Sequence, residues 1–187
     1  MEAKELAERR ERMVAEQIIA RGVSDERVLD AMRRVPRECF VARDLRDVAY
    51  RDGPLPIGAG QTISQPFIVA YMLSKLELLP THRVLEVGTG SGYAAAVLSH
   101  LCAQVYTVER HGRLVRLAKM NLAAAGYPDV RVFGGDGSLG WPQQAPYNAI
   151  VVSAASPSVP KALVDQLVVG GHLVIPVGER SARQYLV

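Results

Sequence analysis

The stretch from Val84 to Tyr93, which reads VLEVGTGSGY, decides the fold of this 187-residue chain. It joins an apolar run over residues 83–87 to three glycines at alternate positions, and a helical pattern begins directly after them. Glycines at such a turn let backbone N–H groups approach a ligand closely. We therefore predict a buried strand, a ligand-binding turn and a helix, in that order.

Apolar runs and helical stretches alternate from residue 67 onward. The further runs cover residues 104–108, 130–133, 149–154 and 172–177, and the helical stretches lie near 67–78, 92–101, 111–125 and 160–168. Strands that alternate with helices form a parallel sheet whose two faces the helices cover. The pattern predicts an α/β, Rossmann-like fold with a mostly parallel sheet.

The chain before this unit is mostly helical in pattern. Apolar positions at helical spacing predict a first helix that ends at Gly22. Ser24 and Asp25 are expected to open a second helix, which Pro36 stops. These segments form an N-terminal helical extension of the α/β unit.

Between the extension and the first strand lies a segment rich in glycine and proline. It runs from Asp52 to Pro66 and stays partly apolar, so we expect a long loop that packs over another part of the protein. We predict a single domain over residues 1–187, in which residues 1–65 form the helical extension and a covering loop and residues 66–187 form the core.

Composition excludes several classes of protein. Two cysteines, Cys39 and Cys102, do not make a disulfide scaffold, and no Cys/His cluster has zinc-site spacing. The charged N-terminus lacks the apolar stretch of a secretory peptide, and no run of about 18 apolar residues predicts a membrane span. The net charge of +3 is too small and diffuse to indicate nucleic-acid binding. We expect a cytoplasmic monomer without a metal, membrane or nucleic-acid partner.

The spacing of the glycines distinguishes between two kinds of ligand. Dinucleotide-binding turns follow the pattern G-x-G-x-x-G, with a small third residue where this chain has Tyr93. Here the third glycine is Gly92, and Glu86 stands two positions before the first glycine. A carboxylate there opposes a pyrophosphate but suits a ligand that carries an ammonium and a sulfonium. The turn therefore favours S-adenosylmethionine over NAD, and an NAD-dependent oxidoreductase is the weakest alternative.

Two more carboxylates follow later strands. Glu109 lies where an acidic side chain accepts hydrogen bonds from ribose hydroxyls, and Asp136 lies where a carboxylate is able to accept from the adenine amine. Each has a simpler explanation, Glu109 as an acid at a helix N-terminus and Asp136 as a turn residue. The coincidence of three carboxylates at neighbouring strand ends favours the ligand site.

The end of the fourth predicted strand bears on the methyl acceptor. Residues 152–157 read VSAASP, with neither the Asn/Asp-Pro-Pro-aromatic motif of enzymes that methylate base amines nor the Pro-Cys motif of base-carbon methylation. Small, unreactive residues suit an acceptor that is already nucleophilic. A carboxylate is such an acceptor, because it is ionised at neutral pH without a general base.

Several motifs together resemble the protein-L-isoaspartate (D-aspartate) O-methyltransferase family over nearly the whole chain. They are Val35–Val41, Leu55–Gly58, Gly60–Pro66, Val84–Tyr93, Gly135–Gly137, Ala145–Tyr147 and Gly170–Gly178. The glycine turn alone is typical of any methyltransferase, whereas the sequence QTISQP is far more specific. The resemblance implies a repair enzyme that transfers the methyl group of S-adenosylmethionine to the free carboxylate of L-isoaspartyl and D-aspartyl residues. The product is S-adenosyl-L-homocysteine, and the partners are isoaspartyl proteins and peptides.

The resemblance also implies the residues of the site. Ser64 is the implied catalytic residue, which orients the substrate carboxylate by a hydrogen bond and is not a nucleophile. The implied cofactor-binding residues are Gln61, Thr62, Ile63 and Ser64 in the wall between cofactor and peptide, Glu86, Gly88, Thr89, Gly90, Ser91 and Gly92 around the methionine part, Glu109 and Arg110 at the ribose, and Asp136 and Gly137 at the adenine.

Ser64 has a second interpretation. It lies two residues before Pro66, so it also suits the N-cap of a helix. The two roles are compatible, and the sequence does not separate them. No histidine stands beside Ser64, which gives a Ser-His catalytic pair little support.

The chain departs from the family pattern in two places. Asn148 stands where the family usually has Asp, and we expect a modest effect because Asn keeps the hydrogen-bonding shape and loses the charge. Residues 184–187 read as the start of a strand, whereas family members continue into further strands, so the C-terminal strands are expected to be missing. Two alternatives to the repair enzyme stay open: a methyltransferase for a small carboxylic acid, and a catalytically silent S-adenosylmethionine-binding module.

Overall fold

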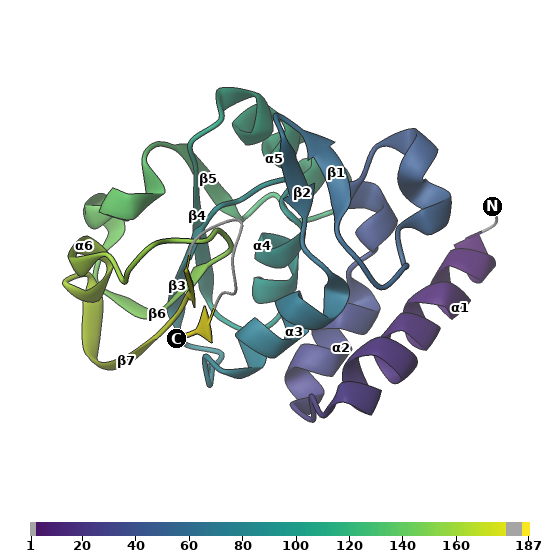
Figure 1. Cartoon of the computed structure of the whole chain (residues 1–187), viewed down its shortest axis with the longest axis horizontal. Helices are drawn as coiled ribbons and strands as arrows, with labels where there is room; N and C mark the ends of the chain where they lie inside the picture. Colours follow the sequence, from purple (N-terminus) through teal and green to yellow (C-terminus); the bar gives the residue numbers. More distant parts are fainter. Residues whose placement is uncertain (1–2, 179–184) are drawn as a thin grey trace.

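Five parallel strands form the central sheet of the computed structural model, which describes residues 3–178 and 185–187 (Figure 1). The strands are β3 (Arg83–Val87), β4 (Gln104–Glu109), β5 (Arg131–Gly134), β6 (Tyr147–Val152) and β7 (Leu167–Val174). They lie in the order β5-β4-β3-β6-β7, which places β3 at the centre. The predicted α/β fold with a parallel sheet is confirmed, and such sheets bind ligands at the carboxyl ends of their strands.

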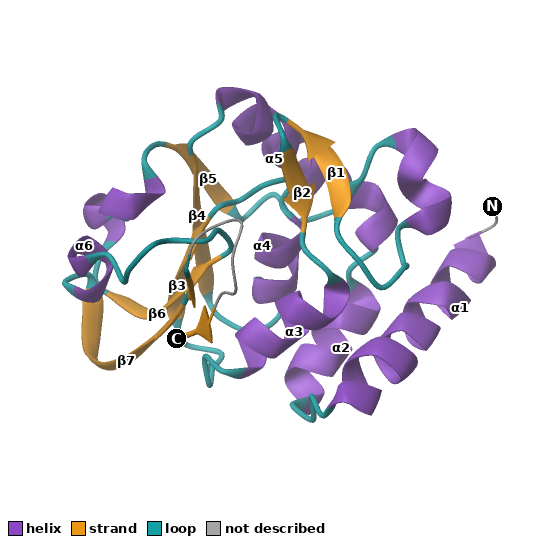
Figure 2. Cartoon of the chain, in the orientation of Figure 1, coloured by secondary structure: helices purple, strands orange, loops and turns teal. Residues whose placement is uncertain are grey.

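Helices and short turns cover both faces of the sheet (Figure 2). One face packs against α3 (Pro66–Ser74), α4 (Tyr93–Leu98) and α5 (Gly112–Ala124). The other face packs against α6 (Lys161–Val164) and the segment that contains the 3-10 turns η5 (Gly137–Leu139) and η6 (Pro142–Gln144). The layers follow the predicted order of strands and helices.

The alternation of side chains along each strand produces two separate cores. On β3, Val84 belongs to the core under α3, α4 and α5, whereas Leu85 and Val87 belong to the core on the opposite face. On β4, Val105 and Tyr106 divide in the same way. Successive side chains of a strand point to opposite faces, so a sheet covered on both sides needs apolar residues at nearly every position.

The N-terminal extension packs on the α3 and α4 side of the sheet, where Figure 1 shows α1 and α2 beside α3. α1 (Ala3–Met13) continues through a π-helical turn, η1 (Val14–Ile18), and a 3-10 turn, η2 (Ile19–Arg21). Gly22 follows with a φ of 90°, which confirms that this glycine ends the first helical segment. α2 (Glu26–Arg34) and the 3-10 turns η3 (Arg37–Phe40) and η4 (Arg43–Val48) complete the extension.

Of the two residues predicted to open α2, Asp25 is the N-cap. Its Oδ1 accepts hydrogen bonds from the backbone N–H groups of Arg27 at 3.0 Å and Val28 at 3.2 Å. These bonds satisfy donors that have no partner within the helix. Ser24 is exposed and lies one residue outside the cap position.

The segment predicted as a long loop contains a β-hairpin, so that prediction is wrong in form. β1 (Leu55–Gly58) and β2 (Gln61–Ile63) pair antiparallel around residues 59–60. Ile57 and Ile63 are buried, and a Cβ on Gly90 would lie 3.1 Å from Ile57 Cδ1. The hairpin therefore packs over the glycine turn, which is the covering position expected for the loop. Its prolines concealed the strands, because they are compatible with unpaired strand edges but rare in sheet interiors.

α3 is shorter than predicted. It ends at Ser74 rather than near residue 78, and Glu77 adopts a φ of 48° that no helix accommodates. Leu76 and Leu78 are buried all the same. The apolar character of these two residues was therefore a sign of burial in the core and not of a helix.

The boundaries near the C-terminus also differ from the prediction. α6 is much shorter than the predicted stretch 160–168, and β7 begins at Leu167 instead of residue 172. Gly170 and Gly171 lie within β7 and weakened its signal, and the pairing of β7 with β6 shifts register between Leu167 and His172, the segment that contains both glycines. β8 (Pro176–Val177) pairs with β9 (Tyr185–Leu186), which confirms the final strand over those two residues, while Gln184 lies outside the described residues.

We expect Asp25→Ala to lower the free energy of unfolding by about 1 kcal/mol, because it leaves two N–H groups of α2 without their partner. The matched control is Ser24→Ala, which should change stability by less than ~0.5 kcal/mol since Ser24 is exposed and caps nothing. Urea unfolding of both variants measures the difference. Equal losses would show that Asp25 is not the cap.

Candidate functional site

The glycine turn joins the carboxyl end of β3 to the start of α4. Gly88, Gly90 and Gly92 have φ angles of 96°, 56° and 98°, a left-handed conformation that residues with a Cβ rarely adopt. Packing adds a second restriction, because a Cβ on Gly92 would lie 3.0 Å from Leu122. The turn therefore depends on glycine for both conformation and space.

Glu86, the first of the three predicted carboxylates, is fully buried beside this turn. Its Oε2 accepts a hydrogen bond from Thr107 Oγ1 at 2.6 Å, and its Oε1 accepts one from Ser153 Oγ at 3.4 Å. Burial raises the pKa of Glu86 to about 8, against the lowering effect of these two hydrogen bonds. The side chain is thus held where a cationic ligand group would stabilise its ionised form.

Glu109, the second carboxylate, connects β4 to the glycine turn. Its Oε2 accepts the N–H of Gly90 at 3.0 Å, and its Oε1 accepts the N–H of His111 at 2.9 Å. His111 is the N-cap of α5, so Glu109 stands just before this helix, but it is buried and does not belong to the first turn, as the simpler explanation of a helix-start acid would require. The contact with Gly90 shows that the same carboxylate also fixes the glycine turn.

The third carboxylate, Asp136, is exposed after β5. Its Oδ1 accepts hydrogen bonds from Ser138 N at 3.0 Å and Ser138 Oγ at 2.8 Å, and these bonds lower its pKa. Asp136 is therefore a turn residue, as its simpler explanation holds. Gly137 packs so tightly on β3 that a Cβ would lie 2.3 Å from Val87 Cγ1.

Arg110, the residue predicted beside Glu109, is exposed, and its Nε donates to His111 Nε2 at 3.2 Å.

A cleft opens between the glycine turn and the β1–β2 hairpin. The predicted site residues that line it are Thr62, Ile63, Ser64, Glu86, Gly88, Thr89, Gly90 and Ser91. Four further lining residues, Val69, Tyr93, Ala94 and Ser153, were not predicted. The structure thus brings together the two walls that the sequence indicated separately.

The other predicted site residues do not line this cleft. They are Gln61, Gly92, Glu109, Arg110, Asp136 and Gly137. Of the lining residues that were missed, Tyr93 and Ala94 follow the glycine turn directly, and Ser153 follows β6 at the same edge of the sheet. Adjacency to strand ends was the available signal for these three, whereas nothing in the sequence distinguished Val69.

A buried hydroxyl in the cleft tests whether these residues fit the predicted cofactor. Ser91 is 2% exposed, and within the described part of the chain its Oγ has no hydrogen-bond partner. A buried polar group without a partner costs about 1–3 kcal/mol, which a polar ligand would relieve. An unpaired hydroxyl, a glycine turn and a buried carboxylate in one cleft fit a ligand with ammonium and carboxylate groups.

Ser64 lies in the hairpin wall of the cleft and is not the N-cap of α3. The N-cap is Gln65, whose side chain makes no capping bond, and Pro66 occupies the first turn. The capping interpretation of Ser64 is therefore wrong. No histidine lines the cleft in the described structure, so a Ser-His pair has no support there.

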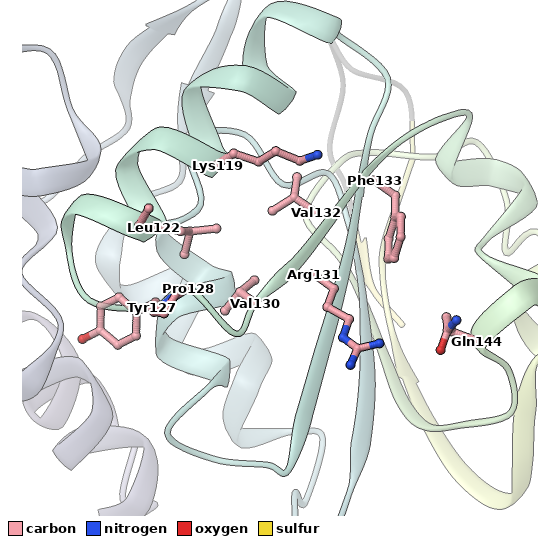
Figure 3. Close-up of a pocket in the computed structure, with 10 residues that line it drawn as sticks. Lys119, Leu122, Tyr127, Pro128, Val130, Arg131, Val132, Phe133 and Gln144 are labelled. Atoms are coloured by element: carbon pink, nitrogen blue, oxygen red, sulfur yellow. The ribbon is translucent and has the colours of Figure 1, made fainter.

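A second hollow lies along the outer edge of β5 (Figure 3). Its walls include Lys119 and Leu122 from α5, Tyr127 from the following loop, and Arg131 and Phe133 from β5. None of the predicted site residues lines it. This hollow is separate from the cleft at the carboxyl ends of the strands.

Asn148, the residue that departs from the family pattern, ties β6 to β3. Its Oδ1 accepts the backbone N–H of Arg83 at 2.8 Å. An amide oxygen performs this task as well as a carboxylate oxygen does, which agrees with the modest effect expected of the change.

Comparison with known proteins identifies the family. The chain matches the family model for protein-L-isoaspartate(D-aspartate) O-methyltransferase over residues 8–187. The chain belongs to this family. Protein-L-isoaspartate O-methyltransferase 2 of Pelobacter propionicus is 60% identical over 179 residues, which cover 96% of this chain and 80% of that protein. Protein-L-isoaspartate O-methyltransferase 1 of Rhodopseudomonas palustris is 56% identical over 186 residues, which cover 76% of it.

Solved structures agree with this assignment. A protein-L-isoaspartate O-methyltransferase is 32% identical with a TM-score of 0.84, and the match covers 95% of this chain and 58% of that one. A Plasmodium falciparum protein, solved with S-adenosyl-L-homocysteine, is 26% identical with a TM-score of 0.81, and the match covers 95% of this chain and 87% of that one. The family, fold and cofactor predictions are confirmed, and the family decides against an NAD-dependent oxidoreductase.

The buried Glu86 makes stability depend on pH. Its pKa of about 8 in the folded, ligand-free protein exceeds its ordinary value of 4.5, so folding favours the protonated form. Its contribution is complete below about pH 4.5 and declines until about pH 8. Glu86→Gln stays neutral, so we expect the variant to gain stability over the wild type by up to about 1.4 kcal/mol per pH unit in that window.

Urea unfolding of both proteins between about pH 5 and pH 9 measures this gain. The difference between variant and wild type should rise with pH and level off above about pH 8. Two parallel stability curves would contradict the assignment. Thr107→Val removes a hydrogen bond that lowers this pKa, so it should move the levelling-off point to higher pH.

Proposed function

We propose that this chain transfers the methyl group of S-adenosylmethionine to the free carboxylate of L-isoaspartyl and D-aspartyl residues in proteins and peptides. One observation carries the proposal: in a member of this family, Ser64 and the glycine turn line the same cleft. The Pelobacter propionicus and Rhodopseudomonas palustris relatives carry the name of this activity and support it. A cytoplasmic location and a monomeric state stay predictions.

The cofactor site that we propose follows the carboxyl ends of three neighbouring strands. Glu86 and the turn from Gly88 to Gly92 would hold the methionine part, with Ser91 Oγ gaining the partner that it lacks among the described residues. Glu109 and Arg110 would lie at the ribose, and Asp136 and Gly137 at the adenine. Gln61, Thr62 and Ile63 would form the wall that separates cofactor from peptide. When bound, S-adenosylmethionine supplies a methyl group on a positively charged sulfur.

The protein's own residues have a modest chemical task in this reaction. The substrate carboxylate is ionised at neutral pH, so no side chain needs to remove a proton. Ser64 would donate a hydrogen bond to that carboxylate and orient one oxygen toward the glycine turn. Correct positioning is able to supply ~7–11 kcal/mol of a barrier. The β1–β2 hairpin would exclude water, which favours a step that neutralises charge.

The first test compares two peptides that differ only in one isoaspartyl or aspartyl linkage. We expect labelled methyl groups from S-adenosylmethionine to enter the isoaspartyl peptide as a base-labile ester and to leave the aspartyl peptide unlabelled. Labelling of small carboxylic acids alone would indicate the small-acid methyltransferase. Binding of S-adenosyl-L-homocysteine without any transfer would indicate a silent module.

Ser64→Ala should lower kcat for the isoaspartyl peptide by roughly 10- to 100-fold, the equivalent of one hydrogen bond to a charged group. The affinity for S-adenosyl-L-homocysteine, measured by calorimetry, should stay within a few-fold. Ser99→Ala is the matched control, because Ser99 bonds to the carbonyl of Ala96 outside the cleft. Unchanged turnover of Ser64→Ala would reject the catalytic assignment.

Glu109→Ala should weaken binding of S-adenosyl-L-homocysteine by at least about tenfold. The change removes the proposed acceptor of the ribose hydroxyls, and each unpaired group costs ~1–3 kcal/mol. It also releases the N–H of Gly90. Arg116→Ala, on the exposed side of α5, is the control and should bind normally. An unchanged Kd in Glu109→Ala would refute the assignment.

A further inference from the structure

Arg37 is a buried cation at the back of the cleft. It belongs to η3, and its side chain is 0% exposed. Its Nε donates to the carbonyl of Ala49 at 2.8 Å, and its Nη2 donates to the carbonyl of Ser64 at 2.9 Å. Its guanidinium carbon lies 4.9 Å from the centre of the Tyr93 ring. Ser64 and Tyr93 both line the cleft, so one side chain contacts both of its walls.

The environment of Arg37 is costly for a residue that serves stability alone. Within the described residues, no carboxylate forms an ion pair with Arg37, and its Nη1 has no hydrogen-bond partner. Desolvation is unfavourable for an unpaired guanidinium and lowers the pKa of Arg37. A neutral apolar side chain would fill the same volume without that penalty. Such costs are typical of functional sites.

The contacts of Arg37 restrict Ser64, the residue whose orientation matters most for the proposed methyl transfer. Ser64 has an unusual position, between the last residue of β2 and the N-cap of α3. A hydrogen bond to its carbonyl fixes the peptide plane after Ser64 and so restrains the backbone from which the Ser64 side chain projects. The planar fork of arginine holds the Ala49 and Ser64 carbonyls at once, which an ammonium does less well.

We propose that Arg37 is a positioning residue for methyl transfer, which sets Ser64 at a fixed distance from the glycine turn by holding the Ser64 carbonyl while its own guanidinium packs over the Tyr93 ring. This inference rests on the proposed function of the cleft. Arg37 acts through Ser64 and Tyr93 and touches neither the cofactor nor the substrate. It extends the active site into the N-terminal helical extension.

The test compares Arg37→Lys with a matched control, Arg27→Lys. Arg27 also donates to two backbone carbonyls, those of Leu78 and Leu101, but neither of these residues lines the cleft. Per folded molecule, Arg37→Lys should lower kcat/KM for the isoaspartyl peptide by roughly 10- to 100-fold, the equivalent of a hydrogen bond to a charged group. Its Kd for S-adenosyl-L-homocysteine should stay within a few-fold. Arg27→Lys should lower Tm without changing kcat/KM.

A double-mutant cycle separates positioning from general stability. If Arg37 acts through Ser64, Arg37→Lys should reduce activity by less than about threefold in a Ser64→Ala background, because the hydroxyl to be positioned is absent. Full additivity, or equal kcat/KM in Arg37→Lys and Arg27→Lys, would overturn the inference. Arg37→Gln, which buries no charge, replaces Arg37→Lys if that variant does not fold.

Hydrogen exchange distinguishes failure of the inference from failure of the proposed function. A wild-type chain that labels no isoaspartyl peptide would contradict the proposed function. Whether or not the wild-type chain labels the peptide, the inference requires faster amide exchange over residues 61–65 in Arg37→Lys than in Arg27→Lys, because the Ser64 carbonyl loses its hydrogen-bond donor. Identical exchange in the two variants would overturn it.

Discussion

The geometry of the site depends on the two hydrogen bonds that the carboxylate of Glu109 accepts. A single side chain at the end of β4 accepts from Gly90 in the turn after β3 and from His111 at the start of α5. The turn after β3, the end of β4 and the start of α5 are thereby fixed relative to each other. The glycines of the turn supply its backbone conformation, but glycine by itself adds freedom rather than order. An anchored turn needs an acceptor such as Glu109.

The polar groups beneath the turn are arranged for a ligand more than for stability. Glu86, Thr107 and Thr89 form a buried chain in which Thr107 lies 2.6 Å from both neighbours, and Glu86 is destabilised in its ionised form. Ser91 adds a buried hydroxyl that has no hydrogen-bond partner over residues 3–178 and 185–187. Interiors rarely keep such groups unless a ligand or a reaction uses them. The energetic cost of burying these groups is thus consistent with affinity for a polar, cationic ligand.

Local patterns predicted the sheet and the glycine turn, and failed where contacts between distant segments decide the structure. β3 and β4 were found because a sheet buried on both faces needs unbroken apolar runs. The β1–β2 hairpin was missed because Ile57 and Ile63 are ordered by packing on a turn some thirty positions later, information that no local window contains. β7 was cut short because Gly170 and Gly171 suppress strand signals. Arg37 stood inside the Val35–Val41 motif, but its burial was not predicted, since a single arginine in a helical extension normally faces solvent.

Tyr93 links the choice of ligand to the role of the extension. Dinucleotide-binding turns keep this position small so that the helix packs closely on the strand. Here the tyrosine is fully buried and turns toward the N-terminal extension. Its ring centroid lies 5.8 Å from that of Phe40 in a T-shaped arrangement, and the guanidinium of Arg37 lies over the ring. Its hydroxyl donates to Met32 Sδ at 3.6 Å. The residue that argued against a dinucleotide therefore also links the glycine turn to Met32, Arg37 and Phe40 of the extension. We infer that the extension and the α/β unit form one domain, because Arg37 of the extension contacts both Ser64 and Tyr93, which line the cleft from opposite sides.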